Sequence, residues 1–283
     1  RRGMRGSLVT AMNMAGVSLT VTVLDEELLL LLDAPTDAPA WPGLVQDPQY
    51  RPARVVDEYA QPDGGSENEW LTLYVRRLSE GFDDLTALDR EAGDGDFGQN
   101  MEAAFGDVRT PIRGSDAEVL HFFAHRMLVR AGGTSGAVLG SLFRELAGAF
   151  DAAGVDSRTT GPEPFARALA DGLQLGLDAI TELGGAKEGD NTLVDALAPA
   201  SRAAQEIAGT GAASTAEVLQ HVFDAAVTGA KATRGMQATK GRASYLGETA
   251  KEVPDPGAIS VTWLFGGAAV ADFWFGGQGR RLC

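Results

Sequence analysis

Three aspartates lie close together in one glycine-rich stretch of the sequence. Asp89, Asp94 and Asp96 are interleaved with Gly93 and Gly95, where one predicted helix ends and the next begins. Glycine lets the backbone turn sharply, so the three carboxylates can converge. Mg²⁺ prefers such hard oxygen donors and is commonly held by a few carboxylates together with water and nucleotide phosphates. The stretch therefore indicates a metal site of the kind found in kinases.

A capped turn is an alternative interpretation of this stretch, because Asp favours helix N-caps and Gly favours turns. A calcium-binding EF-hand is a second alternative. No Glu stands at the closing position of an EF-hand loop counted from Asp94, so calcium sensing is not expected. The aspartate loop alone does not decide between a metal site and a structural turn.

A second loop, 131–136, joins two glycines to Thr134 and Ser135 ahead of an apolar segment that begins at about Ala137. Glycines at the start of a helix expose backbone N–H groups at the positive end of its dipole, which favours bound phosphate. The segment is not a Walker loop, because no Lys follows the glycines at the required spacing. A capped helix after a flexible turn is the structural alternative.

Two further loops combine glycines with polar residues ahead of predicted helices. One covers 184–195, and the other joins 240–245, which includes Arg242, to 254–258. Capping explains many such loops, and an isolated arginine is more often a surface residue. Four such loops, spaced by one or two helices, can nevertheless meet at the same end of an up-and-down bundle. Their recurrence favours a binding site.

The loops are positioned by helices, which are predicted from the spacing of apolar residues. Apolar residues from Trp70 to Phe82 recur at steps of three and four, as on one face of a helix. Similar segments are predicted at about 98–108, 115–130, 135–153, 162–183, 191–208, 214–234 and 258–274. The region has no convincing alternating strand and no repeat of fixed period. The sequence therefore predicts an all-α bundle of about eight helices.

The residues ahead of this bundle follow another pattern. Two strand-like halves, 7–12 and 17–24, precede a short helix predicted over 25–32. Prolines at 35, 39 and 42 exclude regular structure there. A linker is predicted over 43–67, and the helical domain over 68–275. The chain does not begin with Met, which suggests a piece of a longer polypeptide.

Composition excludes several classes of function. The formal net charge of -15 repels phosphate backbones, so nucleic-acid binding is not expected. The single cysteine, Cys283, allows no disulfide framework and favours a cytoplasmic protein. Arginines followed by an apolar run at 8–24 imitate a signal peptide, but Asn13 and several Thr and Ser residues interrupt the run. No stretch is apolar enough to predict a membrane span.

Together these motifs resemble the nucleotide-binding L domain of dihydroxyacetone kinases, also called the DAK2 or DhaL domain. The resemblance covers about 70–270 and rests on an ordered set of motifs. These are GDGDFGQN at 93–100, GGTSG at 132–136, GDNTLVDAL at 189–197, GRASYLGE at 241–248 and PDPGA at 254–258. Residues 4–42 resemble the end of the K domain that precedes the L domain in the single-chain ATP-dependent enzymes, so 1–42 is assigned to it.

The resemblance implies a barrel of eight antiparallel helices that binds ATP or ADP at one end, and it implies a role for each site residue. Asp89, Asp94 and Asp96 are expected to hold two Mg²⁺ ions that bridge the phosphates. The residues expected to line the nucleotide are Phe97, Gly98, Gln99, Asn100, Thr134, Ser135, Gly184, Leu193, Arg242, Asp255, Pro256 and Gly257. Among these, Gly184 and Leu193 are expected to border the adenine, and the loops at 97–100 and 134–135 the phosphates.

The implied activity is ATP-dependent phosphorylation of dihydroxyacetone or a related short ketose, in a homodimer. In this family the ketose is held as a hemiaminal on a histidine of the K domain, and that part of the K domain is absent here. No catalytic residue is therefore expected in this chain, which supplies the ATP–Mg²⁺ domain. Two alternatives stay open: a phosphotransferase-coupled L subunit that keeps ADP bound, and a nucleotide-binding regulator or remnant without catalysis.

Overall fold

The computed structural model describes residues 2–4, 23–34, 44–46, 60–92, 95–240 and 253–266. The chain divides into two compact units, Arg1–Asp57 and Glu58–Cys283. In the first unit, strand β1 (Arg2–Met4) pairs antiparallel with β2 (Leu44–Gln46). Helix α1 (Glu26–Asp33) lies between them in sequence, and its N-cap Asp25 accepts a hydrogen bond from the Leu28 backbone N–H.

The first unit agrees in part with the sequence prediction. Helix α1 confirms the helix predicted over 25–32, shifted by one residue. The strand predicted over 7–12 lies outside the described residues, as does 17–22 of the second. Strand β2 lies inside the segment predicted as a linker, 43–67. Its partner is β1, forty residues earlier in the chain, and such a distant pairing leaves no local signal in the sequence.

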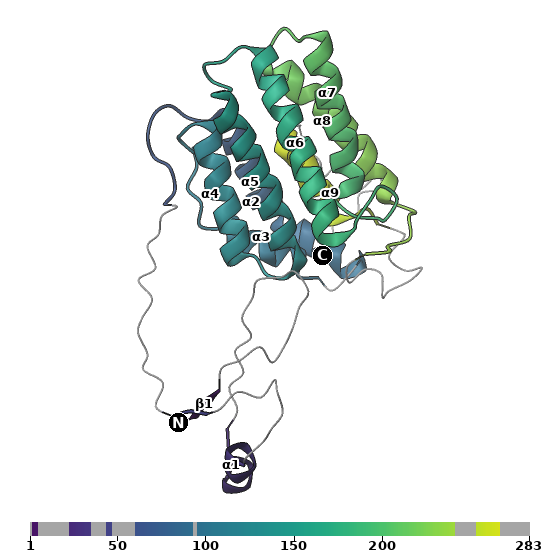
Figure 1. Cartoon of the computed structure of the whole chain (residues 1–283). Coiled ribbons are helices and arrows are strands. Elements are labelled where there is room, and N and C mark those ends of the chain that lie inside the picture. The colour runs from purple at the N-terminus through teal and green to yellow at the C-terminus, as the bar shows by residue number, and fades with distance from the viewer. Residues whose placement is uncertain are drawn as a thin grey trace. The chain divides into compact units, whose positions relative to one another are not determined.

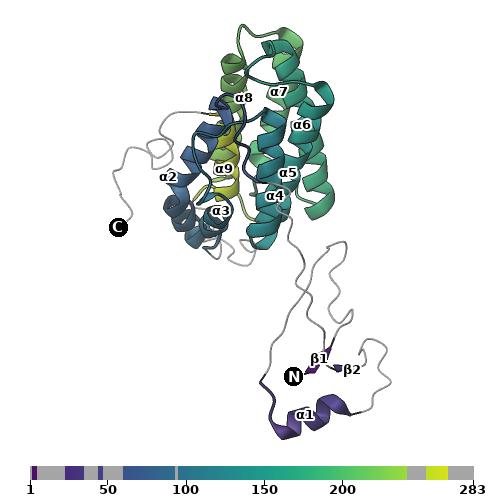
Figure 2. The same cartoon turned by 90° about the vertical axis from the view of Figure 1, so that its left-hand side faces the viewer.

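The described part of the second unit is a helical bundle (Figures 1 and 2). Its helices are α2 (Glu69–Ala92), α3 (Phe97–Phe105), α4 (Asp116–Arg130), α5 (Gly133–Ala153), α6 (Pro162–Gly184), α7 (Val194–Thr210), α8 (Thr215–Thr233) and α9 (Pro256–Phe265). Each helix contacts the next one in sequence, and α9 contacts α2. The ring of contacts therefore closes, which confirms the all-α fold expected from the sequence. Within the described residues, no helix is long and apolar enough to cross a membrane.

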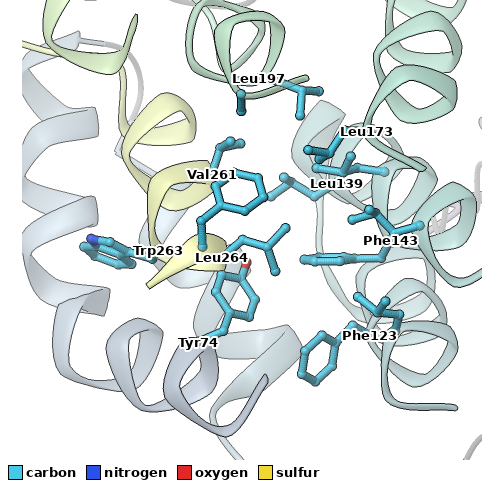
Figure 3. Close-up of a cluster of buried hydrophobic side chains, with 14 of the residues drawn as sticks. Tyr74, Phe123, Leu139, Phe143, Leu173, Leu197, Val261, Trp263 and Leu264 are labelled. Carbon is cyan, nitrogen blue, oxygen red and sulfur yellow. The ribbon is translucent and has the colours of Figure 1, made fainter. Parts of the chain in front are cut away.

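Helix α9 is apolar on every side and is buried along its whole length, as expected for a helix without a polar face. Figure 3 shows Val261 and Leu264 directed into a cluster with Tyr74 of α2 and Phe143 of α5. Trp263 points to the other side, where its ring lies so close to α2 that a Cβ at Gly81 would overlap it. The core is therefore built around α9, whose first turn is held at one end of the bundle.

Helix boundaries differ from the prediction at two places that matter for the loops. Helix α9 ends at Phe265 rather than at 274, because Gly266 takes a φ of 114° that a helix cannot continue through. Helix α7 begins at Val194 rather than at 191, because Asn191 has a φ of 57°. Residues after 266 lie outside the described part of the chain.

Candidate nucleotide and metal site

The described parts of the four predicted loops lie at one end of the bundle. Helices α3, α5, α7 and α9 begin at this end, and α2, α4, α6 and α8 end there. Hydrogen bonds join the first loop to the second and the third to the segment after α8, as described below. The loops gather as expected for an up-and-down bundle.

The junction between α2 and α3 carries the first aspartates. The Asp89 carboxylate accepts a hydrogen bond of 2.9 Å from the backbone N–H of Phe97, the first residue of α3. Gly95 takes a φ of 79°, a left-handed conformation that favours glycine and turns the chain between the two helices. Asp89 and Asp96 are thereby brought to the same junction.

Gly98 lets α3 lie directly against α2. A Cβ at this position would overlap the Phe82 carbonyl oxygen and the Thr86 hydroxyl. The Thr86 hydroxyl is itself held in place, because it donates a hydrogen bond of 2.9 Å to the Phe82 carbonyl oxygen. The first turn of α3 is therefore fixed by backbone packing against α2.

Asn100 connects the aspartate loop to the second loop. Its Nδ2 donates a hydrogen bond of 3.1 Å to Asp96 Oδ1, and its Oδ1 accepts one of 3.0 Å from the backbone N–H of Gly132. Gly132 is the N-cap of α5, and its carbonyl oxygen accepts a hydrogen bond of 3.0 Å from the Ser135 hydroxyl. One side chain therefore sets the spacing between the N-termini of α3 and α5.

Most helix N-termini at this end differ in their caps from those at the other end; the exceptions are α9, which is capped here by Asp255, and α6, which begins at the other end after Gly161 without a side-chain cap. In the described part of the chain, α3, α5 and α7 have no capping hydrogen bond from the N-cap side chain. At the opposite end, the Asn68 side chain accepts a hydrogen bond from Leu71 N in the first turn of α2. The side chains of Ser115 and Ser214 cap α4 and α8. The N-termini of α3 and α5 can offer backbone N–H groups at the positive ends of two helix dipoles to a ligand. The first N–H groups of α7 already donate to Thr192 and Leu193.

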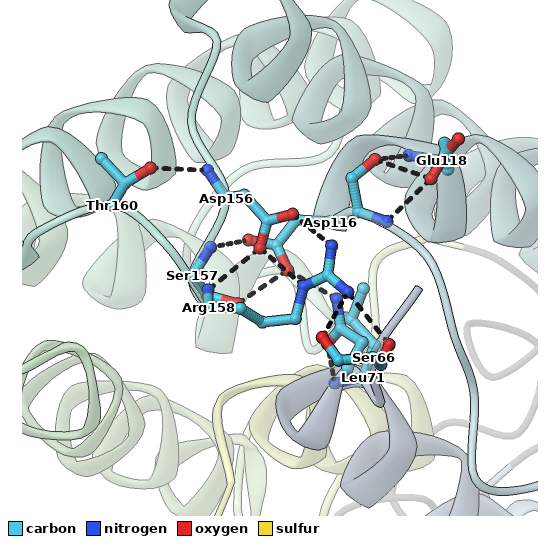
Figure 4. Close-up of polar contacts among 10 residues, drawn as sticks. Ser66, Leu71, Asp116, Glu118, Asp156, Ser157, Arg158 and Thr160 are labelled. Atoms are coloured by element: carbon cyan, nitrogen blue, oxygen red, sulfur yellow. Dashed lines mark hydrogen bonds and ion pairs between the residues drawn. The ribbon is translucent and has the colours of Figure 1, made fainter. Parts of the chain in front are cut away.

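The opposite end is closed by polar contacts, shown in Figure 4. The buried Asp116 carboxylate accepts hydrogen bonds from Asn68 Nδ2 at 2.6 Å and from the backbone N–H of Ser157 at 2.6 Å. Arg158 forms an ion pair of 2.5 Å with Asp156 and donates to the Ser66 carbonyl oxygen at 3.0 Å. The polar groups drawn at this opposite end are paired with one another.

The third loop is ordered by two buried aspartates. Asp195 accepts hydrogen bonds from the backbone N–H groups of Gly189 at 2.6 Å and Thr192 at 2.8 Å. Asp190 accepts one of 2.6 Å from the Thr239 hydroxyl, so the segment after α8 is attached to this loop. That hydrogen bond is the main reason why the pKa of Asp190 is lowered from its ordinary value.

The fourth loop brings Asp255 to the start of α9. Its Oδ1 accepts a hydrogen bond of 2.6 Å from Ala258 N, and its backbone N–H donates one of 2.9 Å to the Thr233 hydroxyl at the end of α8. A Cβ at Gly257 would lie 3.3 Å from Leu193 Cβ, so the first turn of α9 packs against the start of α7. The third and fourth loops are therefore neighbours.

The carboxylates at this end repel one another. Loss of hydration, followed by the negative charge of Asp89, raises the pKa of Asp96 above its ordinary value. Loss of hydration also raises the pKa of Asp255 to about 7, with smaller contributions from the charges of Asp89 and Asp195. A bound cation would stabilise the ionised forms. The donors are all oxygen atoms, which fits a hard divalent ion such as Mg²⁺.

The profile of the DAK2 domain matches residues 91–270, which is more than half of the chain. The chain belongs to the DAK2 domain family. Triokinase/FMN cyclase of Rattus norvegicus is 34% identical over 93% of this chain and 47% of that protein. L-erythrulose 1-kinase of Mycolicibacterium smegmatis is 33% identical over 92% of this chain and 47% of that protein.

A solved structure agrees with this assignment. The dihydroxyacetone kinase from C. freundii, in complex with AMP-PNP and Mg²⁺, matches with a TM-score of 0.52 and 26% sequence identity. The match covers 86% of this chain and 41% of that one. The chain thus spans less than half the length of each of these relatives.

The predicted metal ligands of this DAK2 domain are only partly among the described residues. Asp94 lies outside the described residues, while Asp89 and Asp96 flank it at the α2–α3 junction. No group of three His, Cys, Asp or Glu side chains arranged to hold a metal ion is found among the described residues. The three-aspartate site therefore stays a prediction.

The predicted nucleotide residues fall into two groups. Phe97 belongs to the hydrophobic core, and its backbone N–H already donates to Asp89. Pro256 and Gly257 are likewise buried in the first turn of α9. Several others are at least partly open to solvent at this end, namely Gln99, Asn100, Thr134, Ser135, Gly184 and Leu193. Arg242 lies outside the described residues.

Sequence reasoning missed two residues that organise the site of this DAK2 domain. Asp195 and Thr239 hold the third loop, but neither was singled out from its type or spacing. Asp195 stands in the GDNTLVDAL motif at the first turn of α7, where an aspartate is common for capping reasons alone. Thr239 carries no local signal, because its partner is 49 residues away.

Proposed function

We propose that this chain is the ATP–Mg²⁺ binding domain of a kinase that phosphorylates dihydroxyacetone or a related short ketose, such as erythrulose. The observation that carries the proposal is the arrangement at one end of the bundle. The N-termini of α3 and α5, which have no hydrogen bond from an N-cap side chain, lie there beside Asp89, Asp96 and Asp255. The names of the relatives support a kinase that acts on small sugars or ketoses.

The proposed donor side combines anion and cation binding. Backbone N–H groups at the starts of α3 and α5 bind phosphate oxygens, because helix N-termini favour anions. Asp89, Asp94 and Asp96 hold two Mg²⁺ ions, which supply charge neutralisation for the phosphates. Phosphoryl transfer depends on such positioning and charge neutralisation more than on covalent chemistry by the protein.

The remaining site residues have the binding roles that the family resemblance implies. Phe97 to Asn100 contribute backbone groups near the phosphates, and Thr134 and Ser135 contribute hydroxyls. Gly184 and Leu193 border the base. Arg242 and the segment Asp255–Gly257 complete the pocket, with Asp255 also fixing the first turn of α9.

The acceptor side is proposed to lie in a K domain of the full polypeptide. Residues 1–42 are the end of that domain, and 43–67 connect it to the DAK2 domain at 68–275. The alignments to curated relatives support this division, because they cover 92–93% of the chain and so extend well ahead of residue 91. We further propose that the full protein is a cytoplasmic homodimer whose K domain supplies the histidine that holds the ketose.

An acceptor assay tests this function. The chain, and the natural polypeptide that contains it, would be incubated with ATP, Mg²⁺ and dihydroxyacetone, glyceraldehyde or erythrulose, with ADP release measured. We expect the full polypeptide to phosphorylate at least one acceptor and the chain alone to phosphorylate none efficiently. Failure of the full polypeptide on all three would contradict the proposal. Retention of ADP through dialysis would then favour the phosphotransferase-coupled alternative.

A further inference from the structure

The third loop contains a strained turn. Asn191 has a φ of 57°, and within the described part of the chain it is the one residue other than glycine with a positive φ. The residue is 5% exposed, and its side-chain Oδ1 is buried without a hydrogen-bond partner among the described residues. A left-handed residue and an unpaired buried acceptor both cost folding free energy. Such costs persist where the surrounding structure enforces them.

Asp195 enforces this turn from one side. Its Oδ1 accepts a hydrogen bond of 2.6 Å from Gly189 N, and its Oδ2 accepts one of 2.8 Å from Thr192 N. The two donors lie on either side of Asn191 in sequence, so one carboxylate closes the turn around the strained residue. Asp195 is 4% exposed, and hydrogen bonds to a shielded charged group are among the stronger ones in proteins.

Asp195 is itself held in place by the packing of α8 and α7. A Cβ at Gly229 would overlap the Asp195 carbonyl oxygen, so α8 lies directly against the backbone of α7 at this residue. Thr239 holds the turn from the other side, because its N–H donates to the Asp190 carbonyl oxygen at 3.1 Å and its hydroxyl to Asp190 Oδ1 at 2.6 Å. The turn is therefore held between two anchors that come from different parts of the chain.

The turn leads directly into the proposed nucleotide pocket. Leu193 follows Thr192 and packs against the first turn of α9, where a Cβ at Gly257 would lie 3.3 Å from Leu193 Cβ. A different backbone conformation at 189–192 would move Leu193 relative to α9. The conformation of the turn thus sets the position of the loop that is proposed to border the base.

We propose that Asp195 is a positioning residue for nucleotide binding: it holds the strained 189–192 turn and thereby keeps the loop from Gly184 to Leu193 preformed as a wall for the nucleotide base. The inference rests on the proposed function, since it assigns the base to this loop. It predicts that Asp195 acts on the base and not on the phosphates, which are bound by other loops.

The test compares two ligands that share phosphates and differ in the base. Mg²⁺-ATP binding would be titrated calorimetrically, and Mg²⁺-tripolyphosphate would be measured by competition, for wild type and Asp195→Asn. Asparagine keeps the shape but presents an N–H₂ group to one of the two backbone donors. We expect ATP affinity to fall about tenfold or more, as for loss of a hydrogen bond to a charged group. Tripolyphosphate affinity should change less than about twofold.

Glu206→Gln is the matched control, because it removes one negative charge from α7, the helix that carries Asp195, outside the turn and the loop from Gly184 to Leu193. Glu206 is exposed, and its carboxylate lies 3.8 Å from His221 Nε2. We expect its affinities for both ligands to stay at the wild-type level. Thr239→Val is a second, milder variant of the turn, which can be used if Asp195→Asn fails to fold. It should lower the affinity for ATP more than the affinity for tripolyphosphate.

The outcomes separate this inference from the proposed function. Equal losses for ATP and tripolyphosphate in a folded Asp195→Asn protein would indicate general destabilisation and overturn the positioning role. Unchanged ATP affinity in either turn variant would also overturn it, while leaving the proposed function intact. If wild type binds neither ligand, the proposed function itself fails.

Discussion

Asp255 combines a structural and an electrostatic role at the site. Its Oδ1 caps α9 through the hydrogen bond from Ala258 N, a favourable arrangement for a carboxylate. Loss of hydration nevertheless raises its pKa to about 7, and the charges of Asp89 and Asp195 add to the effect. The residue is therefore poised between its charged and neutral forms near neutral pH.

This raised pKa predicts a pH dependence of stability in the absence of divalent ions. The folded state keeps the Asp255 proton up to about pH 7, whereas an unfolded aspartate loses it near 3.8, so the contribution of Asp255 to stability falls as pH rises between these values. In Asp255→Asn the side chain can still cap the helix but does not titrate. Its free energy of unfolding should therefore fall less with rising pH over this range. Urea unfolding in a chelator at several pH values measures it, and identical slopes for the two proteins would contradict the prediction.

Gly98 gives a prediction about packing. Alanine at this position would overlap the Phe82 carbonyl and the Thr86 hydroxyl, which belong to the backbone and a short side chain of α2. We expect Gly98→Ala to lower the free energy of unfolding by about 1–3 kcal/mol, the usual cost of overpacking. It should also weaken ATP binding, because the first turn of α3 must move.

Gly148→Ala is the control for this substitution. Gly148 lies within α5, and a Cβ there would meet no atom within 4 Å. Alanine should therefore stabilise the protein by about 0.5–1 kcal/mol through its better helix propensity. Denaturant unfolding of both variants would contradict the packing argument if Gly98→Ala were as stable as Gly148→Ala.

At the scale of the elements, Asn100 is the link between α3 and α5. Its hydrogen bonds to Asp96 and to Gly132 N join two helix N-termini that are both proposed to bind phosphate. Asn100 is partly exposed and does not belong to the hydrophobic core. Its expected contribution is therefore to ligand binding more than to stability.

Asn100→Ala tests this link. We expect the free energy of unfolding to fall by about 1 kcal/mol, as for a typical hydrogen bond, while the affinity for Mg²⁺-ATP falls several-fold because the two loops lose their common spacing. Glu102→Ala, an exposed neighbour on α3, serves as the control for loss of a polar side chain. An Asn100→Ala protein that binds ATP as tightly as Glu102→Ala would exclude a bridging role.

The elements also show which features the sequence could predict. The helices follow from apolar periodicity, because burial of one face is encoded every three or four residues, as between Trp70 and Phe82. The loops at the site follow from glycine and aspartate chemistry. Neither the Asn100 bridge nor the Asp195 turn could be predicted, because each depends on how segments pack or turn in three dimensions. Helix α9 was predicted too long, because apolar residues continue in the sequence beyond Gly266, where the helix ends.

At the scale of the whole molecule, the described core and the four site loops all belong to the unit Glu58–Cys283. We therefore expect a protein that begins at Glu58 to fold cooperatively and to bind Mg²⁺-ATP with the affinity of the whole chain. Thermal unfolding and calorimetric titration of both proteins measure this. A shortened protein that folds but no longer binds ATP would show that residues 1–57 contribute to the site.

The central claim is that this end of the bundle binds ATP through Mg²⁺ held by the aspartate loop. Calorimetric titration with ATP, with and without Mg²⁺, tests it on wild type, Asp94→Ala and Asp96→Ala. Asp151→Ala removes an exposed aspartate of α5 that lies next to His121 and serves as the charge control. The account predicts Mg²⁺-dependent binding in wild type and Asp151→Ala that is lost in the other two. Absence of Mg²⁺-dependent binding in wild type, or its survival in Asp94→Ala and Asp96→Ala, would contradict the account.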